Sequence, residues 1–187
     1  MVQVAKALAP QLARFPVCVP ALDAQVKAMV RAINCPGGPW DIGVMLTTNE
    51  HVHRLNRKYR RKDKPTDILS FPFHKVCRHF DGVWMQTRCA HGLINTAQVS
   101  RPGRFPVVRS REERYLGDIY ISLPYVYDQY LDPEETEVTS LEQRMPILFA
   151  HGICHLLGYD HETDADYERM AKAEAFILGR YESYLDK

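Results

Sequence analysis

The sequence predicts an α/β (α+β) fold in which a small mixed sheet is covered by helices. Two observations predict this class. Patterns typical of helices and of strands alternate along the chain, and the composition is that of an ordinary globular protein, with 45% hydrophobic and 25% charged residues. A length of 187 residues suits one domain with a substantial core and is short for two. We therefore expect a single domain over residues 1–187.

The first predicted helix follows Pro20. Its apolar residues recur at spacings of three and four, as on the buried face of a helix, and they are Leu22, Val26, Met29, Val30 and Ile33. The run Cys35-Pro36-Gly37-Gly38 ends this helix. The segment before it has Lys6 and Arg14 but no acidic residue, so that it weakly resembles an organelle transit peptide.

Three short apolar runs predict the strands of the sheet. They are residues 41–47, 67–73 and 116–123. Pro72 places the second run at an edge of the sheet, because proline has no N–H to donate to a neighbouring strand.

The segments between these strands differ in character. Thr48 is a good cap for a helix, whose apolar side we expect to be Val52, Leu55 and Tyr59. Residues 75–114 have no sustained period, eight basic residues and two prolines. We expect this second segment to be an insertion or an extended loop in the domain.

A central helix is predicted over residues 141–157. Ser140 and Gln143 form a capping pair ahead of its apolar run, and Gly158 ends it. Pro146 lies inside the helix and should kink it.

Two further helices complete the second half of the chain. A short one is predicted over residues 124–130, and Thr163 with Asp166 opens a long last helix. The residues expected to face inward from the last helix are Met170, Ile177, Leu178, Tyr181 and Leu185.

Charge is divided unevenly along the chain. Residues 1–116 contain 19 Lys and Arg against 8 Asp and Glu, a formal charge of +11, whereas residues 117–187 contain 5 against 15, a formal charge of −10. A basic surface for a polyanion is one interpretation, and two solvated faces that neutralise each other is the other.

The cysteines and the apolar runs exclude two classes of protein. The cysteines form an odd set without a C-x-x-C pair, which fits neither a secreted disulfide framework nor a thiolate zinc site: Cys18, Cys35, Cys77, Cys89 and Cys154. The cysteines therefore favour a protein that works in a reducing compartment. No apolar run near the predicted central helix approaches the ~18 residues that cross a bilayer, so we expect no membrane span.

Three histidines near the end of the central helix predict a metal site. His151 and His155 are four residues apart, which places both rings on one face of a helix, and Gly158 allows the chain to turn so that His161 supplies a third nitrogen. Three neutral ligands leave one position open, which is the pattern of catalytic rather than structural zinc. We expect one Zn²⁺ per chain; the alternative is that these are ordinary core or surface histidines.

Two neighbours of these histidines narrow the chemistry. Gly152 occupies the place of the glutamate base in the zinc-peptidase motif H-E-x-x-H, so a metalloprotease is disfavoured. Cys154 points to a different face of the helix from His151 and His155 and is expected in the core.

The segment 54–64 carries a dense basic run with the single acid Asp63. Lys and Arg bind phosphates by charge and counterion release, and a fixed guanidinium can brace a scissile phosphate. A solvated helix face is the simpler alternative. Because the run leads directly into a predicted strand, at least one arginine can be held in place. The expected RNA contacts are Arg57, Lys58, Arg61 and Lys64.

Three segments together resemble the YbeY family of rRNA maturation factors, regarded as single-strand endoribonucleases. They are residues 55–73 (LNRKYRRKDKPTDILSFPF), 116–122 (LGDIYIS) and 151–161 (HGICHLLGYDH). The resemblance implies an α/β fold with a small mixed sheet and a role in processing small-subunit rRNA. It also implies that His151, His155 and His161 are the metal ligands and that Arg60 is the functional arginine.

The sequence therefore predicts a zinc-dependent endoribonuclease or rRNA maturation factor in which Arg60 is catalytic and stabilises charge on the phosphate. The alternative is an assembly factor that binds small-subunit precursor rRNA without cleaving it. The expected partners are precursor rRNA of the small subunit and ribosomal or assembly proteins. The acid-free start of the chain and the basic segment 75–114 favour a mitochondrial location, with a cytoplasmic one as alternative.

Overall fold

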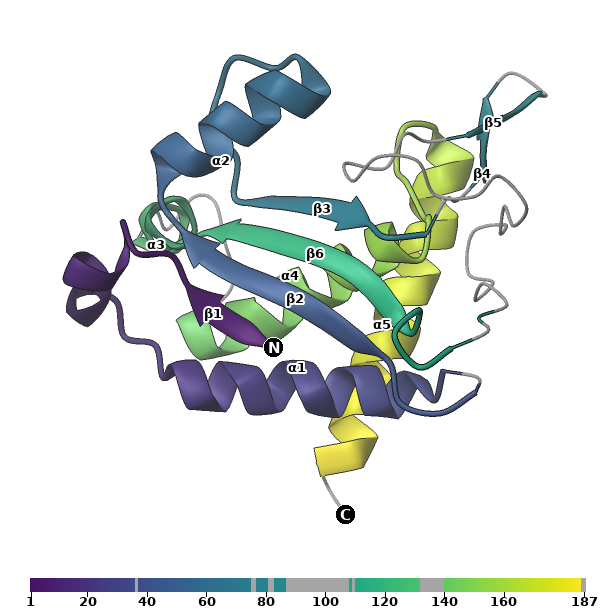
Figure 1. Ribbon diagram of the computed structural model, residues 1–187, viewed down its shortest axis with the longest axis horizontal. Helices are drawn as coiled ribbons and strands as arrows, with labels where there is room; N and C mark the ends of the chain where they lie inside the picture. Colours follow the sequence, from purple (N-terminus) through teal and green to yellow (C-terminus); the bar gives the residue numbers. More distant parts are fainter. Residues whose placement is uncertain are drawn as a thin grey trace.

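The computed structural model describes residues 1–35, 37–74, 77–80, 83–86, 108, 110–131 and 140–185. Its main feature is a four-stranded mixed sheet in the order β1-β2-β6-β3 (Figure 1). The strands are β1 (Val2–Val4), β2 (Asp41–Thr47), β6 (Tyr115–Ser122) and β3 (Ile68–Pro72). The first three run parallel, and β3 pairs antiparallel to β6 at the edge. The predicted α/β class, the mixed sheet and the edge position of the Pro72 strand are confirmed.

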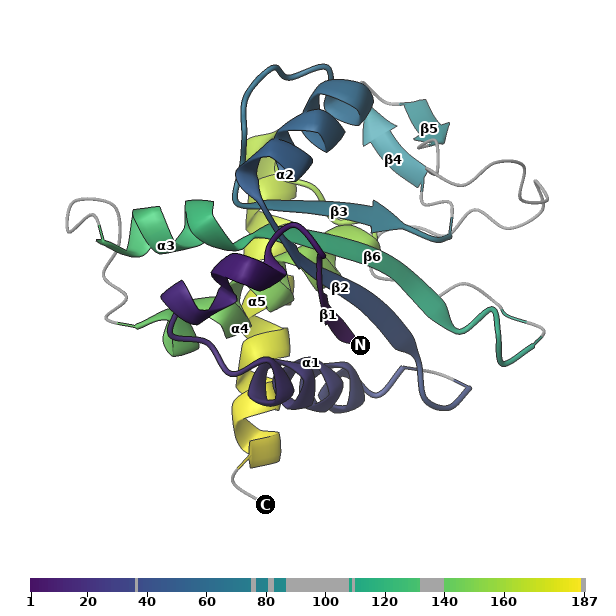
Figure 2. The same ribbon diagram turned by 60° about the vertical axis from the view of Figure 1, so that its left-hand side comes forward.

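Five α-helices accompany the sheet in the described part of the chain. They are α1 (Val19–Ile33), α2 (Asn49–Leu55), α3 (Leu123–Leu131), α4 (Leu141–Leu156) and α5 (Asp164–Leu185). The helix α1 connects the parallel neighbours β1 and β2, which cannot be joined by a tight turn. In Figure 1, α4 and α5 lie behind the sheet and α2 stands above β3; Figure 2 shows the same arrangement from a second side.

One hydrophobic core fills the space between the sheet and α1, α4 and α5. Alternate residues of β2 point into it, and Ile42, Val44 and Leu46 are all buried. The helix α4 packs into the same core, and its side chains Phe149 and Ile153 have no exposed surface. The helix that carries two of the predicted ligands is therefore held by the core of the domain. None of the helices in the described part of the chain is long and apolar enough to span a membrane.

The start of the chain differs from the sequence-based expectation. Val2–Val4 pairs with β2, the Val2 amide donates to Asp23 Oδ1 at 2.8 Å, and Leu8 is completely buried. A 3-10 helix, Ala9–Arg14, follows. These residues form an edge strand and part of the core, two features that were not predicted from the sequence.

The ends of α4 agree with the sequence. The Ser140 hydroxyl accepts the amide of Gln143 at 3.3 Å, and Gly158 adopts a left-handed φ of 87° just beyond the helix. Pro146 lies inside the helix; the kink expected there stays a prediction.

The helix that Thr48 opens was predicted only in part. Thr48 accepts the amide of His51 and Val52 is buried, as expected. The chain then widens into a π-helical turn, η2 (Asn56–Arg60). As a result Asn56 is buried, whereas Tyr59 is 43% exposed instead of facing the core.

Two other expectations need correction. Leu185, expected to face inward from α5, is 60% exposed, although Met170, Ile177 and Tyr181 are buried as predicted. The segment 75–114 contains a two-stranded hairpin of β4 (Cys77–Phe80) and β5 (Val83–Gln86). Most of the rest of this predicted insertion lies outside the described residues.

We expect Gly117→Ala to lower the free energy of unfolding by about 3 kcal/mol. Gly117 has a φ of 138°, and a β-carbon there would overlap the carbonyl oxygen of Phe71 and lie 2.8 Å from the Phe73 amide nitrogen. Both neighbours are backbone atoms of the adjoining segment and cannot move aside independently. Urea unfolding followed by circular dichroism would measure the change.

Gly179→Ala is the matched control. A β-carbon at Gly179, on an exposed turn of α5, would meet nothing within 4 Å. Because alanine favours a helix over glycine, the stability should rise by about 0.5–1 kcal/mol. An equal effect of the two substitutions would show that the close approach at Gly117 is unimportant.

Candidate metal centre

The three predicted histidines lie together. His151 and His155 come from successive turns of α4, with ring centroids 4.6 Å apart, and His161 follows the turn at Gly158. The His161 ring lies 5.5 Å from that of His151 and 5.2 Å from that of His155. One nitrogen from each ring can be chosen so that all three lie within 4.8 Å of one another. Helix spacing followed by a glycine turn thus produces the cluster that the sequence suggested.

Hydrogen bonds on the outer side of two rings fix their orientation. His151 Nδ1 lies 2.8 Å from Glu174 Oε1, and His155 Nδ1 lies 3.0 Å from the Tyr159 carbonyl oxygen. A backbone carbonyl can only accept a hydrogen bond, and so can an ionised carboxylate. Both Nδ1 atoms must therefore carry hydrogens, which leaves the Nε2 atoms as bases.

The two Nε2 atoms face each other at 3.1 Å. With both Nδ1 atoms protonated, neutral rings would point two lone pairs at each other, which is repulsive. A cation shared by the two nitrogens, either a proton or a metal ion, removes the repulsion. This arrangement, together with the nearby nitrogens of His161, fits a divalent metal that prefers imidazole, such as zinc.

The electrostatic environment keeps His155 in the form that binds metals. Burial is the main reason that the pKa of His155 falls to about 3; the neighbouring His151 and, least of all, Arg60 act in the same direction, and Asp160 opposes the shift. His155 is therefore neutral near pH 7 and its lone pair is available.

The two neighbours singled out in the sequence lie away from the cluster. Cys154 is completely buried in the core, and burial raises the pKa of its thiol. A β-carbon on Gly152 would lie 2.7 Å from Ile119 Cδ1, in the sheet. A glutamate at position 152 would thus be directed into the core and could not serve as a base beside the histidines.

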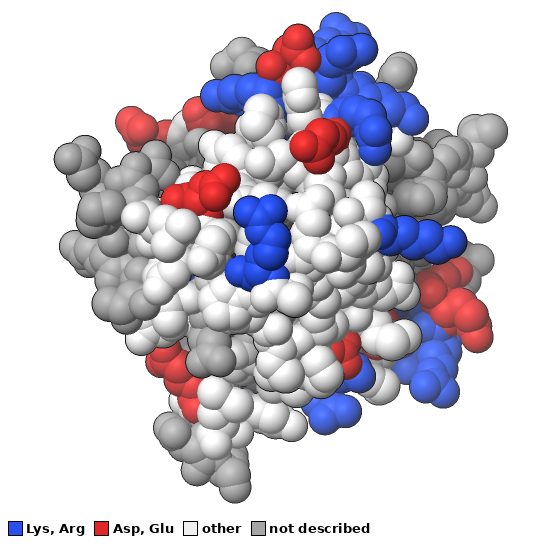
Figure 3. All heavy atoms as spheres, turned by 90° about the vertical axis from the view of Figure 1, so that its left-hand side faces the viewer, with Lys and Arg blue, Asp and Glu red and all other residues white. Residues whose placement is uncertain are grey.

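The basic run forms an exposed ridge on and after α2. Arg57, Lys58, Arg60, Arg61 and Lys64 are all exposed. In Figure 3, Lys and Arg side chains gather at the top of the molecule, where α2 and the turn after it lie in Figure 1.

Contacts of the buried Asn56 and of the half-exposed Tyr59 hold this ridge in place. The Asn56 side-chain amide donates to the Lys64 carbonyl oxygen at 2.7 Å and so closes the loop that carries the charges. The Tyr59 ring packs edge-on against Phe71 of β3 at 5.1 Å, and Lys58 Nζ lies 5.0 Å from the Tyr59 ring centre. The arginines therefore project from a fixed turn.

One polar residue beside the histidine cluster was not predicted from the sequence. Glu174 reaches His151 from α5. A signal was present, because Glu174 follows Met170 by four residues and precedes Ile177 by three, and thus shares the buried face of α5. A carboxylate on such a face needs a partner.

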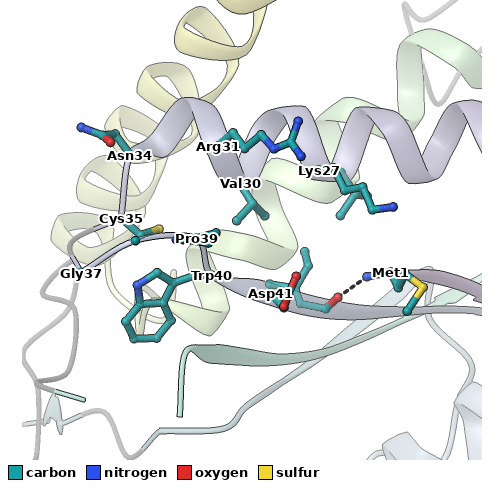
Figure 4. A pocket seen from close by; sticks show the side chains of 13 residues that line it. Met1, Lys27, Val30, Arg31, Asn34, Cys35, Gly37, Pro39, Trp40 and Asp41 are labelled. Carbon is teal, nitrogen blue, oxygen red and sulfur yellow. Dashed lines mark hydrogen bonds between the residues drawn. The ribbon is translucent and has the colours of Figure 1, made fainter. Parts of the chain in front are cut away.

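A hollow of about 570 Å³ lies elsewhere, between α1 and the start of β2. Figure 4 shows Arg31 and Lys27 along one side of it and Trp40 and Asp41 along the other. None of the predicted ligands or RNA contacts lines this hollow.

Comparison with known proteins agrees with the resemblance seen in the three sequence segments. A human protein named Endoribonuclease YbeY is 29% identical over 139 residues, which are 74% of this chain and 66% of the human protein. Proteins of the same name from Shouchella clausii and Acetivibrio thermocellus are 33% and 34% identical, each over 75% of this chain and 72% of the relative. The chain thus matches just under two thirds of the human protein's length.

The model of a protein family described as Endoribonuclease YbeY matches residues 19–182, which include β2, β6, the basic ridge and all three histidines. Because the match extends over most of the chain, the chain belongs to the YbeY family.

Proposed function

We propose that this protein is a zinc-dependent endoribonuclease that processes small-subunit ribosomal RNA. The observation that carries the proposal is the convergence of two Nε2 atoms, fixed as bases by their Nδ1 partners, beside a third histidine. The endoribonuclease names of the family model and of the relatives supply the reaction class.

In this proposal His151, His155 and His161 hold the metal. A bound zinc ion would act as a Lewis acid and bring the pKa of a coordinated water towards ~7. The chain's own contribution is to present neutral imidazoles and to keep the neighbouring side chains of α4 away from the open position. Because Cys154 and position 152 both face the core, neither competes for it.

Arg60 is the proposed catalytic cation. Arg60 ends the turn η2 and belongs to the exposed basic ridge, and in this proposal its guanidinium is directed at a phosphate held near the histidines. A guanidinium there can bind two phosphate oxygens and stabilise the negative charge that grows as the phosphodiester is attacked.

The remaining ridge residues are proposed to bind the RNA backbone. Arg57, Lys58, Arg61 and Lys64 are exposed around Arg60, and they offer charge rather than a base-reading surface. The half-exposed ring of Tyr59 beside them can stack on an unpaired base, which suits single-stranded RNA.

A second candidate is an assembly factor that binds precursor rRNA of the small subunit, and its proteins, without cleavage. The ridge favours it, because phosphate binding by exposed cations needs no metal.

Human and bacterial relatives match at similar identity. The mitochondrial location, with the cytoplasm as alternative, therefore stays a prediction.

The purified protein should bind about one zinc ion per chain, and His155→Ala should lose nearly all of it. His53→Ala is the control, since His53 lies on α2 and pairs with Asp63 at 2.8 Å. Elemental analysis after gel filtration would measure the metal. Equal zinc contents in wild type and His155→Ala would exclude the proposed site.

The zinc-loaded protein should cleave an unstructured RNA oligonucleotide, and a chelator should stop the reaction. Arg60→Ala should slow cleavage about 10²-fold, as expected for loss of one charge stabiliser, whereas Arg31→Ala on α1 should not. Gel analysis of end-labelled RNA gives the rates. RNA binding without cleavage by the zinc-loaded protein would replace the nuclease by the assembly factor, and hydrolysis of peptides would favour a protease instead.

Lys58→Gln combined with Arg61→Gln should reduce the salt dependence of RNA binding. The slope of log K against log[salt] should fall by about 0.7 for each phosphate that the variant no longer neutralises. Fluorescence anisotropy with labelled RNA at several salt concentrations would show it. The double variant Arg169→Gln/Lys172→Gln on α5 changes the charge equally and should keep the wild-type slope.

A further inference from the structure

A carboxylate from the last helix stands behind the candidate metal ligands. Glu174 of α5 holds His151 Nδ1 at 2.8 Å, and the side chains of His151 and Glu174 are 29% and 28% exposed. The two α4 histidines differ in this respect, because His155 has a neutral partner, the Tyr159 carbonyl.

The directions of the two His151 nitrogens limit the roles that Glu174 can have. In an imidazole ring Nδ1 and Nε2 point in different directions, and Nε2 of His151 is the atom directed at His155. A carboxylate bound to Nδ1 is thus separated from the cluster by the ring itself. Glu174 is therefore suited neither to ligate the metal nor to take a proton from a group bound there, and it must act through His151.

The fold fixes the position of Glu174. Met170 and Ile177, one turn before and one turn after it, are each only 2% exposed, so the turn of α5 that carries Glu174 is anchored in the core on both sides. The helix α5 also packs against α4. The carboxylate is consequently presented to His151 by two packed helices.

We infer that Glu174 is a positioning residue of the metal centre, which holds His151 in the Nδ1–H tautomer and makes its Nε2 a stronger ligand. A carboxylate has this effect because its negative charge stabilises positive charge on the ring when the opposite nitrogen binds a cation. The inference rests on the proposed metal site and adds a residue from outside the ligand motif.

Two variants separate the charge of Glu174 from its hydrogen bond. Glu174→Gln keeps an oxygen that can accept from Nδ1 but removes the negative charge, and Glu174→Ala removes both. Glu168→Gln is the matched control, since Glu168 is an exposed glutamate of the same helix. Zinc affinity is measured by competition with a chromophoric chelator, the coordination geometry by the visible spectrum of the Co²⁺-loaded protein, and folding by the thermal midpoint of the metal-free protein.

Zinc affinity should fall about 10- to 100-fold in Glu174→Gln and at least as far in Glu174→Ala. The metal-free midpoint should stay close to that of Glu168→Gln. The Co²⁺ spectrum of Glu174→Ala should change, because an untethered ring can rotate.

Other outcomes would overturn the inference in recognisable ways. Wild-type zinc affinity in Glu174→Ala would overturn the role of Glu174 and leave the proposed function intact. A lower midpoint with unchanged affinity would assign Glu174 a purely structural role. If the wild-type chain itself fails to bind zinc, the proposed function and the inference fall together.

Discussion

The close approach of α4 to the sheet is the constraint on which the site depends. Gly152 lets the helix come so near that a β-carbon would lie 2.7 Å from Ile119, and from the sheet side Gly117 makes room for Leu156. With this contact fixed, helix geometry turns successive residues by about 100°. His151 and His155 are then placed on a flank of the helix to one side of Gly152, where His151 meets Glu174 of α5 and His155 meets the Tyr159 carbonyl.

The same contact explains why position 152 suits glycine rather than the glutamate of the zinc-peptidase motif. A β-carbon at position 152 would lie 2.7 Å from Ile119 Cδ1, so the space that a glutamate side chain would need is filled by Ile119. A carboxylate that reaches the histidines therefore has to come from another element. The chain supplies Glu174 from α5, on the outer side of a histidine.

The part of the site that could be predicted from the sequence is the part made by local geometry. Four-residue spacing on a helix and a glycine turn bring His151, His155 and His161 together whatever the sheet topology is. Glu174 was missed because its contact joins residues 23 positions apart through the packing of two helices. Its place on the buried face of α5 was the available signal.

The fold shows the same division between local and tertiary determinants. Longer elements with clear periods, such as α1 and α4, were predicted to within a few residues. The strand Val2–Val4 has only three residues and shows no period, and its pairing with β2 depends on tertiary contacts. Tyr59 was predicted to face inward because a regular helix was assumed, whereas the π-helical turn at Asn56–Arg60 changes which side chains are buried.

Charged residues from both the basic first part and the acidic second part of the chain act on the histidines. Burial dominates the pKa of His155, and smaller contributions of opposite sign come from Asp160 in the acidic second part, which raises the pKa, and from Arg60 in the basic first part, which lowers it. Glu174, also from the acidic part, bonds to His151. Opposite charges from the two parts of the chain thus act on adjacent rings. In the proposed function, the acidic groups stabilise a cation at the cluster and the ridge attracts a polyanion. The two roles are kept apart because the Glu174 carboxylate stands behind the His151 ring and Arg60 lies on an exposed turn.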